Sequence, residues 1–500
     1  MSADAAASDS SRSGETVPSG QPMTAACVEA RHLIGGRWIG AERTARRWNP
    51  ARGDELVSVA PVGDRNIVDE AVAAARASAP AWASMTGEAR GAVLARTAGA
   101  LRARASEAAT LIAREEGKTL AEASGEVGRA AAMLEFYASL GRQPLGSTLP
   151  SADGSMHLYT TREPVGVVGL VTPWNFPIAI PVWKAAPALV AGNTVVVKPA
   201  SIVPGSMHLL AECFEEAGLP AGVLNVVHGS GGEAGQALVE HPEVDAISFT
   251  GSGAVGRRIN ITAAERMARV QLELGGKNGM LVMPDADMEL AADLCARGAF
   301  GLTGQACTAT SRVVVMEGDE QRFLDALVAR TMQIRIGDPL DPDTTMGPVV
   351  TEQQLRTDVS WIERALADGA ELVSGGVASG SFLTPTILRR VEPEHAIARE
   401  EVFGPVLAVM VARSPEEAMR IMNGTEYGLS AGIVTSDLAA AMEFSRTIDA
   451  GVIKVNRLTT GTDVNAPFGG MRASSNGLFR EQGFSATDFF TRVKTTYVGF

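Results

Sequence analysis

Residues 165–198 read VGVVGLVTPWNFPIAIPVWKAAPALVAGNTVVVK and carry the strongest signal of the fold. Two short, valine-rich apolar runs, 165–171 and 194–198, flank a helical segment that ends at Ala191. Short apolar runs without polar alternation are typical of strands buried on both faces. Strand, helix and strand in this order predict parallel strands joined by a crossover helix.

The same alternation continues along the chain. A helix over 207–217 is followed by predicted strands at 223–227 and 246–249, and the second half has further predicted strands at 279–283, 312–316, 406–411 and 432–434. The region before residue 165 is mostly helical, with Asp64 as the cap of a first helix and further helices over 88–116 and 120–140. We therefore predict an α/β fold with two lobes.

Length and composition exclude several classes of protein. A chain of 500 residues is long enough for two or more domains, and 46% hydrophobic with 20% charged residues is typical of a soluble globular protein. The net charge of −13 argues against a nucleic-acid binder, which must neutralise phosphates. We find no run of about 18 uninterrupted apolar residues, so we predict no contact with a membrane.

The ends of the chain and its cysteines give further expectations. Residues 1–30, rich in Ala, Ser and Gly at the start, predict a disordered tail and not a signal peptide. The four cysteines are too few and too scattered for a disulfide framework, which favours a reducing compartment such as the cytoplasm: Cys27, Cys213, Cys295 and Cys307. The six histidines show no ligand pair at metal spacing, so we predict no metal site.

The last apolar run, 489–498, alternates like a strand and has no evident hairpin partner in its own lobe. An unpaired edge strand is a site of association, so this segment predicts contact with another subunit.

A glycine-rich turn follows the predicted strand at 246–249. Residues 251–256 read GSGAVG, a G-x-G-x-x-G pattern in which backbone N–H groups can approach a phosphate at a helix N-terminus. In a chain with 53 glycines the pattern also arises as a plain tight turn, and its strand-before, helix-after context favours the nucleotide site. Glu273, 17 residues beyond Gly256, lies near where an acid would bind the ribose.

Three segments of the sequence favour a different task for Glu273. Cys307 lies among small residues in GQACT, Glu273 opens ELGGK, and Asn175 lies in a turn between prolines. A thiol, a carboxylate and an amide together can act as a nucleophile, a base and an oxyanion stabiliser. Each of them alone is more commonly structural.

Together these segments resemble the aldehyde dehydrogenase superfamily, in the family's order and over roughly residues 31–500. The matching motifs are TPWNFP (172–177), KPAS (198–201), FTGS (249–252), ELGGK (273–277), GQACTATSR (304–312), EEVFGP (400–405) and PFGG (467–470).

The resemblance implies a role for each matching residue. Cys307 would be the nucleophile, Asn175 with the Cys307 N–H the oxyanion hole, and Glu273 the base that activates water to hydrolyse a thioester. That base favours release of a free acid over transfer to coenzyme A. The residues implied in cofactor binding are Thr172, Pro173, Trp174, Lys198, Ser201, Gly251, Ser252, Leu274, Glu401 and Phe403.

The resemblance also implies an architecture. We expect a Rossmann-like NAD(P)-binding domain (31–142 and 162–274), an α/β catalytic domain (275–470) and a small β oligomerisation element (143–161 and 485–500) in a homodimer or homotetramer.

Two residues depart from common family patterns. Ser201 stands three residues after Lys198, where many NAD-preferring relatives carry Glu, and this favours NADP as the cofactor with NAD possible. Ala306 stands directly before Cys307, where many relatives have a larger residue. The sequence therefore does not decide which side chain forms this wall of the pocket.

Within the family, three segments resemble α-ketoglutaric semialdehyde (2,5-dioxopentanoate) dehydrogenases: WKAAPAL (183–189), CTATSR (307–312) and LTTGTDVNAPFGG (458–470). Trp183 stands where relatives that use succinate semialdehyde often place an arginine. Because a buried carboxylate needs a partner, we predict that Arg457, with Thr459 and Thr460, binds the acidic tail of the substrate. Arg457 as a solvated surface residue is the alternative.

The leading hypothesis is an NAD(P)-dependent, hydrolytic aldehyde dehydrogenase acting on a keto-acid semialdehyde. The alternatives are an enzyme for succinate semialdehyde or a broader range of aldehydes, a thiol esterase without redox turnover, and a catalytically silent scaffold.

Overall fold

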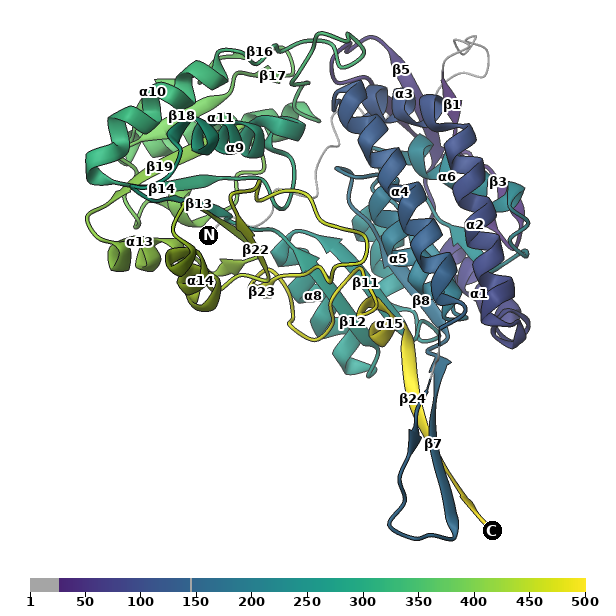
Figure 1. The fold of residues 1–500 in the computed structure, drawn as a ribbon. Coiled ribbons are helices and arrows are strands. Elements are labelled where there is room, and N and C mark those ends of the chain that lie inside the picture. Colours follow the sequence, from purple (N-terminus) through teal and green to yellow (C-terminus); the bar gives the residue numbers. More distant parts are fainter. Residues whose placement is uncertain (1–26, 144–145) are drawn as a thin grey trace.

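The computed structural model describes residues 27–143 and 146–500. Two lobes lie side by side, each built on its own seven-stranded sheet, and an arm of three strands extends from one of them (Figure 1). The predicted domain boundary at 274/275 falls in the short connection between the last strand of the first sheet and the first strand of the second.

The first sheet has the strand order β12-β11-β8-β9-β10-β2-β3. Its central strands are parallel, and β2 and β3 add an antiparallel edge. The strands are β2 (His32–Ile34), β3 (Arg37–Ile39), β8 (Val167–Val171), β9 (Thr194–Lys198), β10 (Leu224–Val226), β11 (Ala246–Gly251) and β12 (Arg269–Leu274).

Helices cover both faces of this sheet because alternate strand residues point to opposite sides. Val195 and Val197 pack into one core with α2 to α6, and Val196 packs into the other with α1, α7 and α8. The helices are α1 (Arg65–Ser84), α2 (Gly87–Ala103), α3 (Ala105–Glu116), α4 (Leu120–Leu140), α5 (Ala179–Val190), α6 (Pro204–Glu216), the π-helix η1 (Gly231–Gly235), α7 (Gln236–Glu240) and α8 (Gly253–Glu265). A three-stranded sheet, β1 (Val28–Glu29), β5 (Leu56–Pro61) and β4 (Thr44–Trp48), lies beside them.

The second sheet has the order β15-β18-β19-β14-β13-β21-β22 and is parallel except for β15. Its strands are β13 (Gly279–Val282), β14 (Arg312–Met316), β15 (Glu371–Ser374), β18 (Thr386–Arg389), β19 (Val406–Ala412), β21 (Ser430–Val434) and β22 (Val452–Val455). The surrounding helices are α9 (Met288–Phe300), the 3-10 helices η2 (Gly301–Gly304) and η3 (Glu317–Asp319), α10 (Glu320–Thr331), α11 (Glu352–Ala367), α12 (Ala396–Arg399), α13 (Pro415–Met422) and α14 (Leu438–Thr447). Two short ribbons are β16 (Ala378–Ser379) with β17 (Phe382–Leu383) and β20 (Tyr427–Gly428) with β23 (Met471–Arg472).

The arm consists of β6 (Thr148–Leu149), β7 (Met156–Pro164) and β24 (Thr491–Gly499), which follows the short helix α15 (Ala486–Phe490). β24 pairs antiparallel with β7 from Thr491 opposite Pro164 to Gly499 opposite Met156, and the arm points away from both lobes (Figure 1). The predicted terminal strand therefore has a partner within the chain, and its outer edge is open in the monomer.

The structure differs from the prediction in the first lobe, where the strand β12 was not predicted. The helix predicted over 88–116 is two helices, because Arg104 leaves the helical conformation (φ −102°, ψ 16°) between α2 and α3. The predicted tail ends earlier than residue 30, since Val28 and Glu29 pair with Ser58 and Val59 of β5. The rest of the predicted tail, residues 1–26, lies outside the described residues.

Candidate active site

The oxyanion donor and the nucleophile loop meet between the lobes. Asn175 follows β8, is 4% exposed, and its side-chain Nδ2 donates a hydrogen bond of 2.9 Å to the carbonyl of Gln305. Gln305 stands two residues before Cys307, and its own side chain accepts from the N–H of Val350 at 2.9 Å. The structure thus brings together two of the three predicted catalytic residues, which lie far apart in the sequence.

The backbone before Cys307 has an uncommon conformation. Leu302 and Thr303 have φ of 53° and 55°, and Gly304 has φ of 68°, so the loop turns sharply after α9. Two bonds from distant elements hold this loop: Glu122 of α4 accepts from the Leu302 N–H at 2.7 Å, and Asn278 Nδ2 donates to the Cys307 carbonyl at 2.8 Å. A fixed backbone at this point fixes the position of the thiol.

The Cys307 thiol is half-buried. Burial raises its pKa, and the nearby carboxylates of Glu401 and Glu273 raise it further. A thiol in such surroundings needs a base to become the nucleophilic thiolate.

Glu273 has the surroundings of a general base. It lies in β12, is 2% exposed, and neither carboxylate oxygen has a hydrogen-bond partner among the described residues. The backbone of Gly469 approaches so closely that a Cβ there would lie 2.6 Å from Oε1. Burial and the neighbouring Glu481 raise the pKa of Glu273 well above its usual range, which makes its ionised form a stronger base.

A buried ion pair that the sequence analysis missed lies beside Glu273. Lys184 of α5 forms an ion pair with Glu481 and donates to Ser248 Oγ at 2.8 Å. Burial raises the pKa of Glu481 also. The signal in the sequence was a single lysine within the otherwise apolar residues 179–190.

A second buried pair holds the Asn175 turn from behind. Lys118 and Glu126 form an ion pair of 2.7 Å with side chains 0% and 1% exposed. Lys118 also donates to the backbone carbonyl of Asn175, and Glu126 accepts from the N–H groups of Ile178 and Ala179 at 2.9 and 3.0 Å. The pair therefore anchors the turn that carries the oxyanion donor.

The predicted phosphate site lies at the N-terminus of α8. Ser252 is the N-cap and makes no capping side-chain bond, and a Cβ at Gly253 would meet nothing within 4 Å. The first N–H groups of a helix have no acceptor within the helix itself. Two hydroxyls at the ends of neighbouring strands, Thr172 and Thr250, are buried without partners among the described residues. Free donors at a helix N-terminus fit the pyrophosphate of a dinucleotide.

Lys198 ends β9 in the same region. It is 5% exposed, and its ammonium forms no hydrogen bond or ion pair with another described residue. Burial lowers its pKa to about 8. Ser201, three residues further along the chain, is exposed. The unpaired ammonium of Lys198 and the Ser201 hydroxyl are groups that can bind a ribose or its phosphate.

The residues predicted at the nicotinamide end also come together. Glu401 accepts from the N–H of Gly276 at 3.0 Å, and burial raises its pKa to about 7. The rings of Trp174 and Phe403 meet edge to face with centroids 5.4 Å apart. Phe403 adopts a positive φ of 63°, an uncommon conformation for an aromatic residue. Leu274 packs against Gly256 of α8, and Pro173 stands between Thr172 and Trp174.

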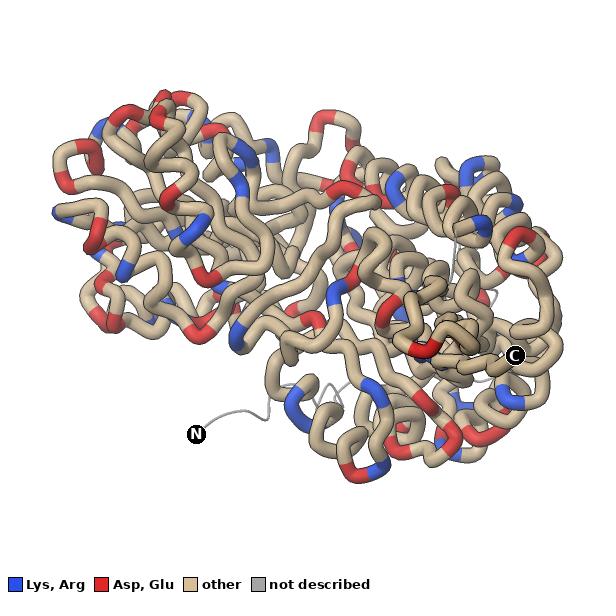
Figure 2. The backbone as a smooth tube through the Cα atoms, turned by 60° about the horizontal axis from the view of Figure 1, so that its bottom comes forward, with Lys and Arg blue, Asp and Glu red and all other residues tan. Residues whose placement is uncertain are grey.

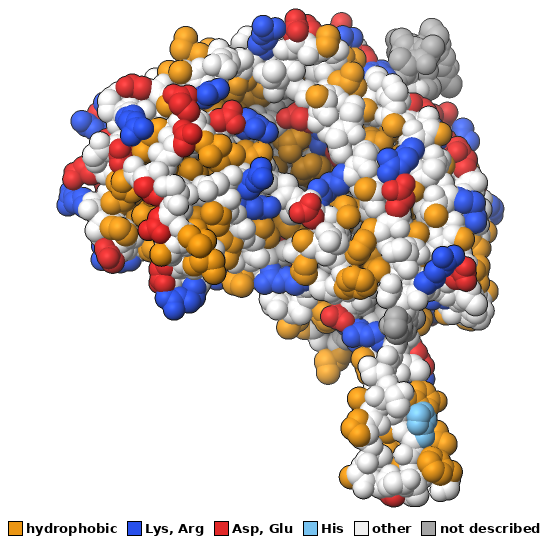
Figure 3. Space-filling view, in the orientation of Figure 1, with side chains coloured by type: hydrophobic (Ala, Val, Ile, Leu, Met, Phe, Trp, Pro, Cys, Tyr) orange, Lys and Arg blue, Asp and Glu red, His pale blue; other side chains and the backbone are white. Residues whose placement is uncertain are grey.

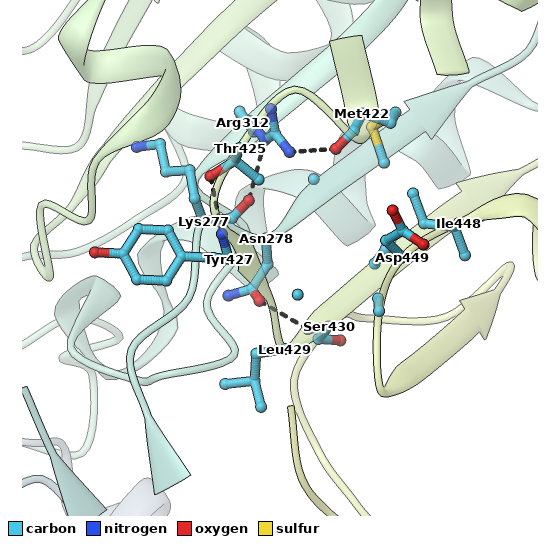
Figure 4. Close-up of a pocket in the computed structure, with 14 residues that line it drawn as sticks. Lys277, Asn278, Arg312, Met422, Thr425, Tyr427, Leu429, Ser430, Ile448 and Asp449 are labelled. Carbon is cyan, nitrogen blue, oxygen red and sulfur yellow. Dashed lines mark hydrogen bonds between the residues drawn. The ribbon is translucent and has the colours of Figure 1, made fainter. Parts of the chain in front are cut away.

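Bonds behind the ELGGK segment (273–277) fix its position. Arg312 Nε donates to the Lys277 carbonyl at 3.0 Å, and Asn278 accepts from the Ser430 N–H at 3.0 Å (Figure 4). The cavity there, about 10 Å³, has room for about one water molecule and none for a substrate.

The prediction for the acidic tail of the substrate is wrong at Thr459. Thr459 is 0% exposed, and its hydroxyl bonds the Thr308 carbonyl and the Thr310 hydroxyl, both at 2.8 Å, so it supports the nucleophile loop from behind. Arg457 is exposed and contacts no other described residue by hydrogen bond or ion pair. Trp183 is 8% exposed and lies near Glu481, with its ring 5.7 Å from that of Phe468.

A cavity of about 440 Å³ opens between α4 and α9, and the space-filling view shows this hollow between the lobes, with hydrophobic side chains inside and charged ones at its rim (Figure 3). Leu302, Leu458 and Thr460 line it, and these residues flank the nucleophile loop and its support.

A comparison with protein families decides what this arrangement is. Residues 38–496 match the aldehyde dehydrogenase family. The chain belongs to that family.

Named relatives of this aldehyde dehydrogenase cover nearly its whole length. It is 45% identical to the alpha-ketoglutaric semialdehyde dehydrogenase of Bacillus subtilis (93% of this chain, 97% of the relative). It is 43% identical to the 2,5-dioxopentanoate dehydrogenase of Saccharolobus solfataricus (93% and 98%). Among solved structures, an E. coli NADP-dependent enzyme superposes with a TM-score of 0.92 at 34% identity, covering 95% of this chain and 98% of the other.

The described part of this aldehyde dehydrogenase has neither a candidate membrane span nor a candidate metal cluster. None of its described helices is long and apolar enough to cross a membrane. Within residues 27–143 and 146–500, no group of three or more His, Cys, Asp or Glu side chains could hold a metal ion. Basic and acidic residues alternate over the backbone without a single-sign face in the view of Figure 2.

Proposed function

We propose that this aldehyde dehydrogenase oxidises 2,5-dioxopentanoate to 2-oxoglutarate, with NADP as the preferred cofactor. The observation that carries the reaction is the hydrogen bond from Asn175 to Gln305, which holds the amide donor at the nucleophile loop. The names of the two relatives support the substrate. Trp183, in place of an arginine, supports a keto acid over succinate semialdehyde.

The residues of the chain suggest how the reaction proceeds. Cys307 Sγ, once deprotonated, attacks the aldehyde carbon to give a thiohemiacetal whose oxyanion accepts hydrogen bonds from Asn175 Nδ2 and the Cys307 N–H. The bound oxidised nicotinamide supplies a hydride acceptor. Glu273 then removes a proton from water, which attacks the thioester on Cys307 and releases the carboxylate and the thiol. The unpartnered state of Glu273 suits this task, because its oxygens are free to bind that water.

The cofactor preference is argued from Lys198 and Ser201. A carboxylate at position 201 would repel a 2′-phosphate, whereas a hydroxyl and an unpaired ammonium can bind it. The E. coli relative named as NADP-dependent supports the same preference, and NAD stays the alternative.

We propose a homodimer or homotetramer in the cytoplasm. β24 and β22 are both outer strands of their sheets, and unpaired strand edges are sites of association. The four free cysteines fit a reducing compartment. The molar mass in solution, measured by light scattering for the whole chain and for a chain ending at residue 490, tests the role of the arm; a truncated chain of unchanged mass would refute it.

The decisive experiment for the function is a comparison of kcat/KM for 2,5-dioxopentanoate and succinate semialdehyde, each with NADP⁺ and NAD⁺. We expect a large preference for the longer keto acid and for NADP⁺. Comparable or reversed values for the two aldehydes would refute the substrate, and thioester hydrolysis without NAD(P)H formation from any aldehyde would favour a thiol esterase.

A further inference from the structure

Arg129 of α4 is a half-buried cation without an anion. Its Nη2 donates to Thr462 Oγ1 and, at 3.4 Å, to Gln482 Oε1. Among the described residues no carboxylate lies within ion-pair distance of this guanidinium, although the field of Asp463 acts on it. Its environment is dry enough that desolvation lowers its pKa.

This arrangement leaves donors unused. A guanidinium has five N–H groups, and both hydrogen bonds that Arg129 donates come from Nη2. Partly burying a charge without a partner costs free energy, which a bound anion would offset. Carboxylates match the planar fork of arginine with two parallel hydrogen bonds.

Arg129 is connected to Trp183 and Phe468, the aromatic pair beside which the substrate would lie. Its partner Gln482 directly follows Glu481, whose backbone exchanges two hydrogen bonds of 2.7 Å with Phe468. Phe468 in turn packs against the ring of Trp183. The guanidinium is therefore connected to the aromatic pair through Gln482 and the backbone of Glu481.

The helix that carries Arg129 also borders the cavity. Glu122 lines the cavity of about 440 Å³ between α4 and α9 and stands seven residues before Arg129. Seven residues are about two helical turns, so both side chains leave the same face of α4. The loop that contains Thr460 and Thr462 lies beside that face of α4.

We infer that Arg129 and Thr462 bind the far carboxylate of an acidic aldehyde while its aldehyde group lies at Cys307. This inference rests on the proposed function and assigns the acid-binding role to Arg129 in place of Arg457 and Thr459. The guanidinium supplies charge and a paired donor set, and the Thr462 hydroxyl, now donating to Gln482 Oε1 at 3.3 Å, supplies a further donor.

The test compares Arg129→Met, Arg129→Lys and Thr462→Val with the wild type on two aldehydes of equal chain length, 2,5-dioxopentanoate and uncharged pentanal. We expect kcat/KM for the acid to fall about 10- to 100-fold in Arg129→Met, the usual effect of losing hydrogen bonds to a charged group, while pentanal changes little. Arg129→Lys should recover part of the loss, because it keeps the charge without the fork. Thr462→Val should show a smaller loss, again confined to the acid.

Lys454 provides the matched control. It is a second cation beside the same loop, at the end of β22, and it acts electrostatically on both Arg129 and Asp463, but its ammonium donates to the Gly461 carbonyl at 2.8 Å. Lys454→Met should leave kcat/KM for the acid within about threefold of the wild type, since long-range charge effects are largely screened. An equal loss in Lys454→Met and Arg129→Met would overturn the inference, as would an equal loss on the acid and on pentanal.

The same kinetic data test the inference on Arg129 and the proposed substrate separately. A wild-type preference for the acid that survives in Arg129→Met overturns the inference alone. A wild-type enzyme without any preference for the acid overturns the proposed substrate and the inference together.

Discussion

The ammonium of Lys118 donates a hydrogen bond to the backbone carbonyl of Asn175, 57 residues further along the chain. The opposite side of the same residue, its side-chain amide, points to the nucleophile loop at Gln305. Lys118 thus holds the back of the residue that we predict to be the oxyanion donor, and it makes no hydrogen bond to Cys307. It acts as a positioning residue, because a small displacement of a catalytic group has a large effect on rate.

Lys118→Met should lower kcat about 10- to 100-fold with a smaller change in KM, because the amide would no longer be aimed at the oxyanion. The loss should vanish in an Asn175→Ala background, where there is no amide to aim. Steady-state kinetics of the two single variants and the double variant measure this coupling.

Arg90→Met is the matched control for that cycle. Arg90 is a buried cation that holds the other end of α5, donating to the Val190 carbonyl at 2.9 Å. Its loss should lower the melting temperature and leave kcat within about twofold. Additive effects of Lys118→Met and Asn175→Ala would show that Lys118 acts only on stability.

Glu273→Gln separates the two halves of the reaction. The amide cannot accept a proton, so hydrolysis of the thioester should slow at least about 100-fold while one equivalent of NAD(P)H still forms per site in a rapid burst. Stopped-flow absorbance measures both phases, and Cys307→Ser, which lacks the thiol, should lose the burst as well. A Glu273→Gln variant without a burst would mean that this carboxylate is needed to deprotonate the thiol.

The pH dependence of the wild type follows from the same group. Because burial and Glu481 raise the pKa of Glu273, this carboxyl keeps its proton to higher pH than a free glutamate, and only its ionised form can accept a proton from water. Turnover should therefore rise with pH, with a midpoint above the ordinary glutamate value of 4.5, and this rise should be absent from the residual turnover of Glu273→Gln. A pH profile whose rise lies at the ordinary glutamate value would contradict the raised pKa.

Ser201→Glu should reverse the cofactor preference. A carboxylate near Lys198 repels a 2′-phosphate and can accept a hydrogen bond from a 2′-hydroxyl, so kcat/KM with NADP⁺ should fall about 100-fold while that with NAD⁺ is kept or rises. Ser201→Gln has the same length without the charge. Equal losses of kcat/KM with NADP⁺ in the two variants would mean that the size of the side chain at position 201, and not its charge, determines the cofactor preference.

How far the sequence predicted the molecule depends on the range of the interactions involved. β9 and β14 have the predicted bounds, and Asp64 caps α1 by accepting from the Ile67 N–H, because these features depend on neighbouring residues. β12 was missed, since its polar residues Gln271 and Glu273 are buried only because partners from residues 469–481 cover them. Family motifs supplied the catalytic trio. The contacts of Lys118, Lys184 and Arg129 join residues 57 to 353 positions apart, and no local pattern reports such pairs.

Asp358 of α11 packs against the segment that contains Phe403, and its burial predicts how the stability of the protein depends on pH. It is fully buried against Gly404, next to Phe403, and its Oδ1 accepts from Gln354 Nε2 at 2.8 Å, a side chain that also donates to the Val402 carbonyl at 3.1 Å. Burial raises the pKa of Asp358 to about 8. The folded protein therefore keeps this carboxyl protonated at pH values where the unfolded chain, with a pKa near 3.8, has lost the proton.

The sign of the pH effect follows from proton binding. Between about pH 4 and 8 the folded state binds more protons than the unfolded state, so this group lowers the free energy of unfolding as pH rises. Asp358→Asn cannot ionise and should gain melting temperature relative to the wild type, by a margin that grows from pH 5 to pH 8 and is constant above it.

Asp285 is the control with the opposite sign. Its carboxylate accepts from the N–H groups of Ser436 and Asp437 at 2.8 and 2.9 Å, and the Ser436 hydroxyl and these bonds lower its pKa. Asp285→Asn should lose melting temperature at pH 5 and above, and the loss should disappear as pH falls below about 3.8. Thermal unfolding of the three proteins from pH 3 to 9 tests both signs. An Asp358→Asn margin that is independent of pH would show that this carboxyl is already ionised in the folded protein.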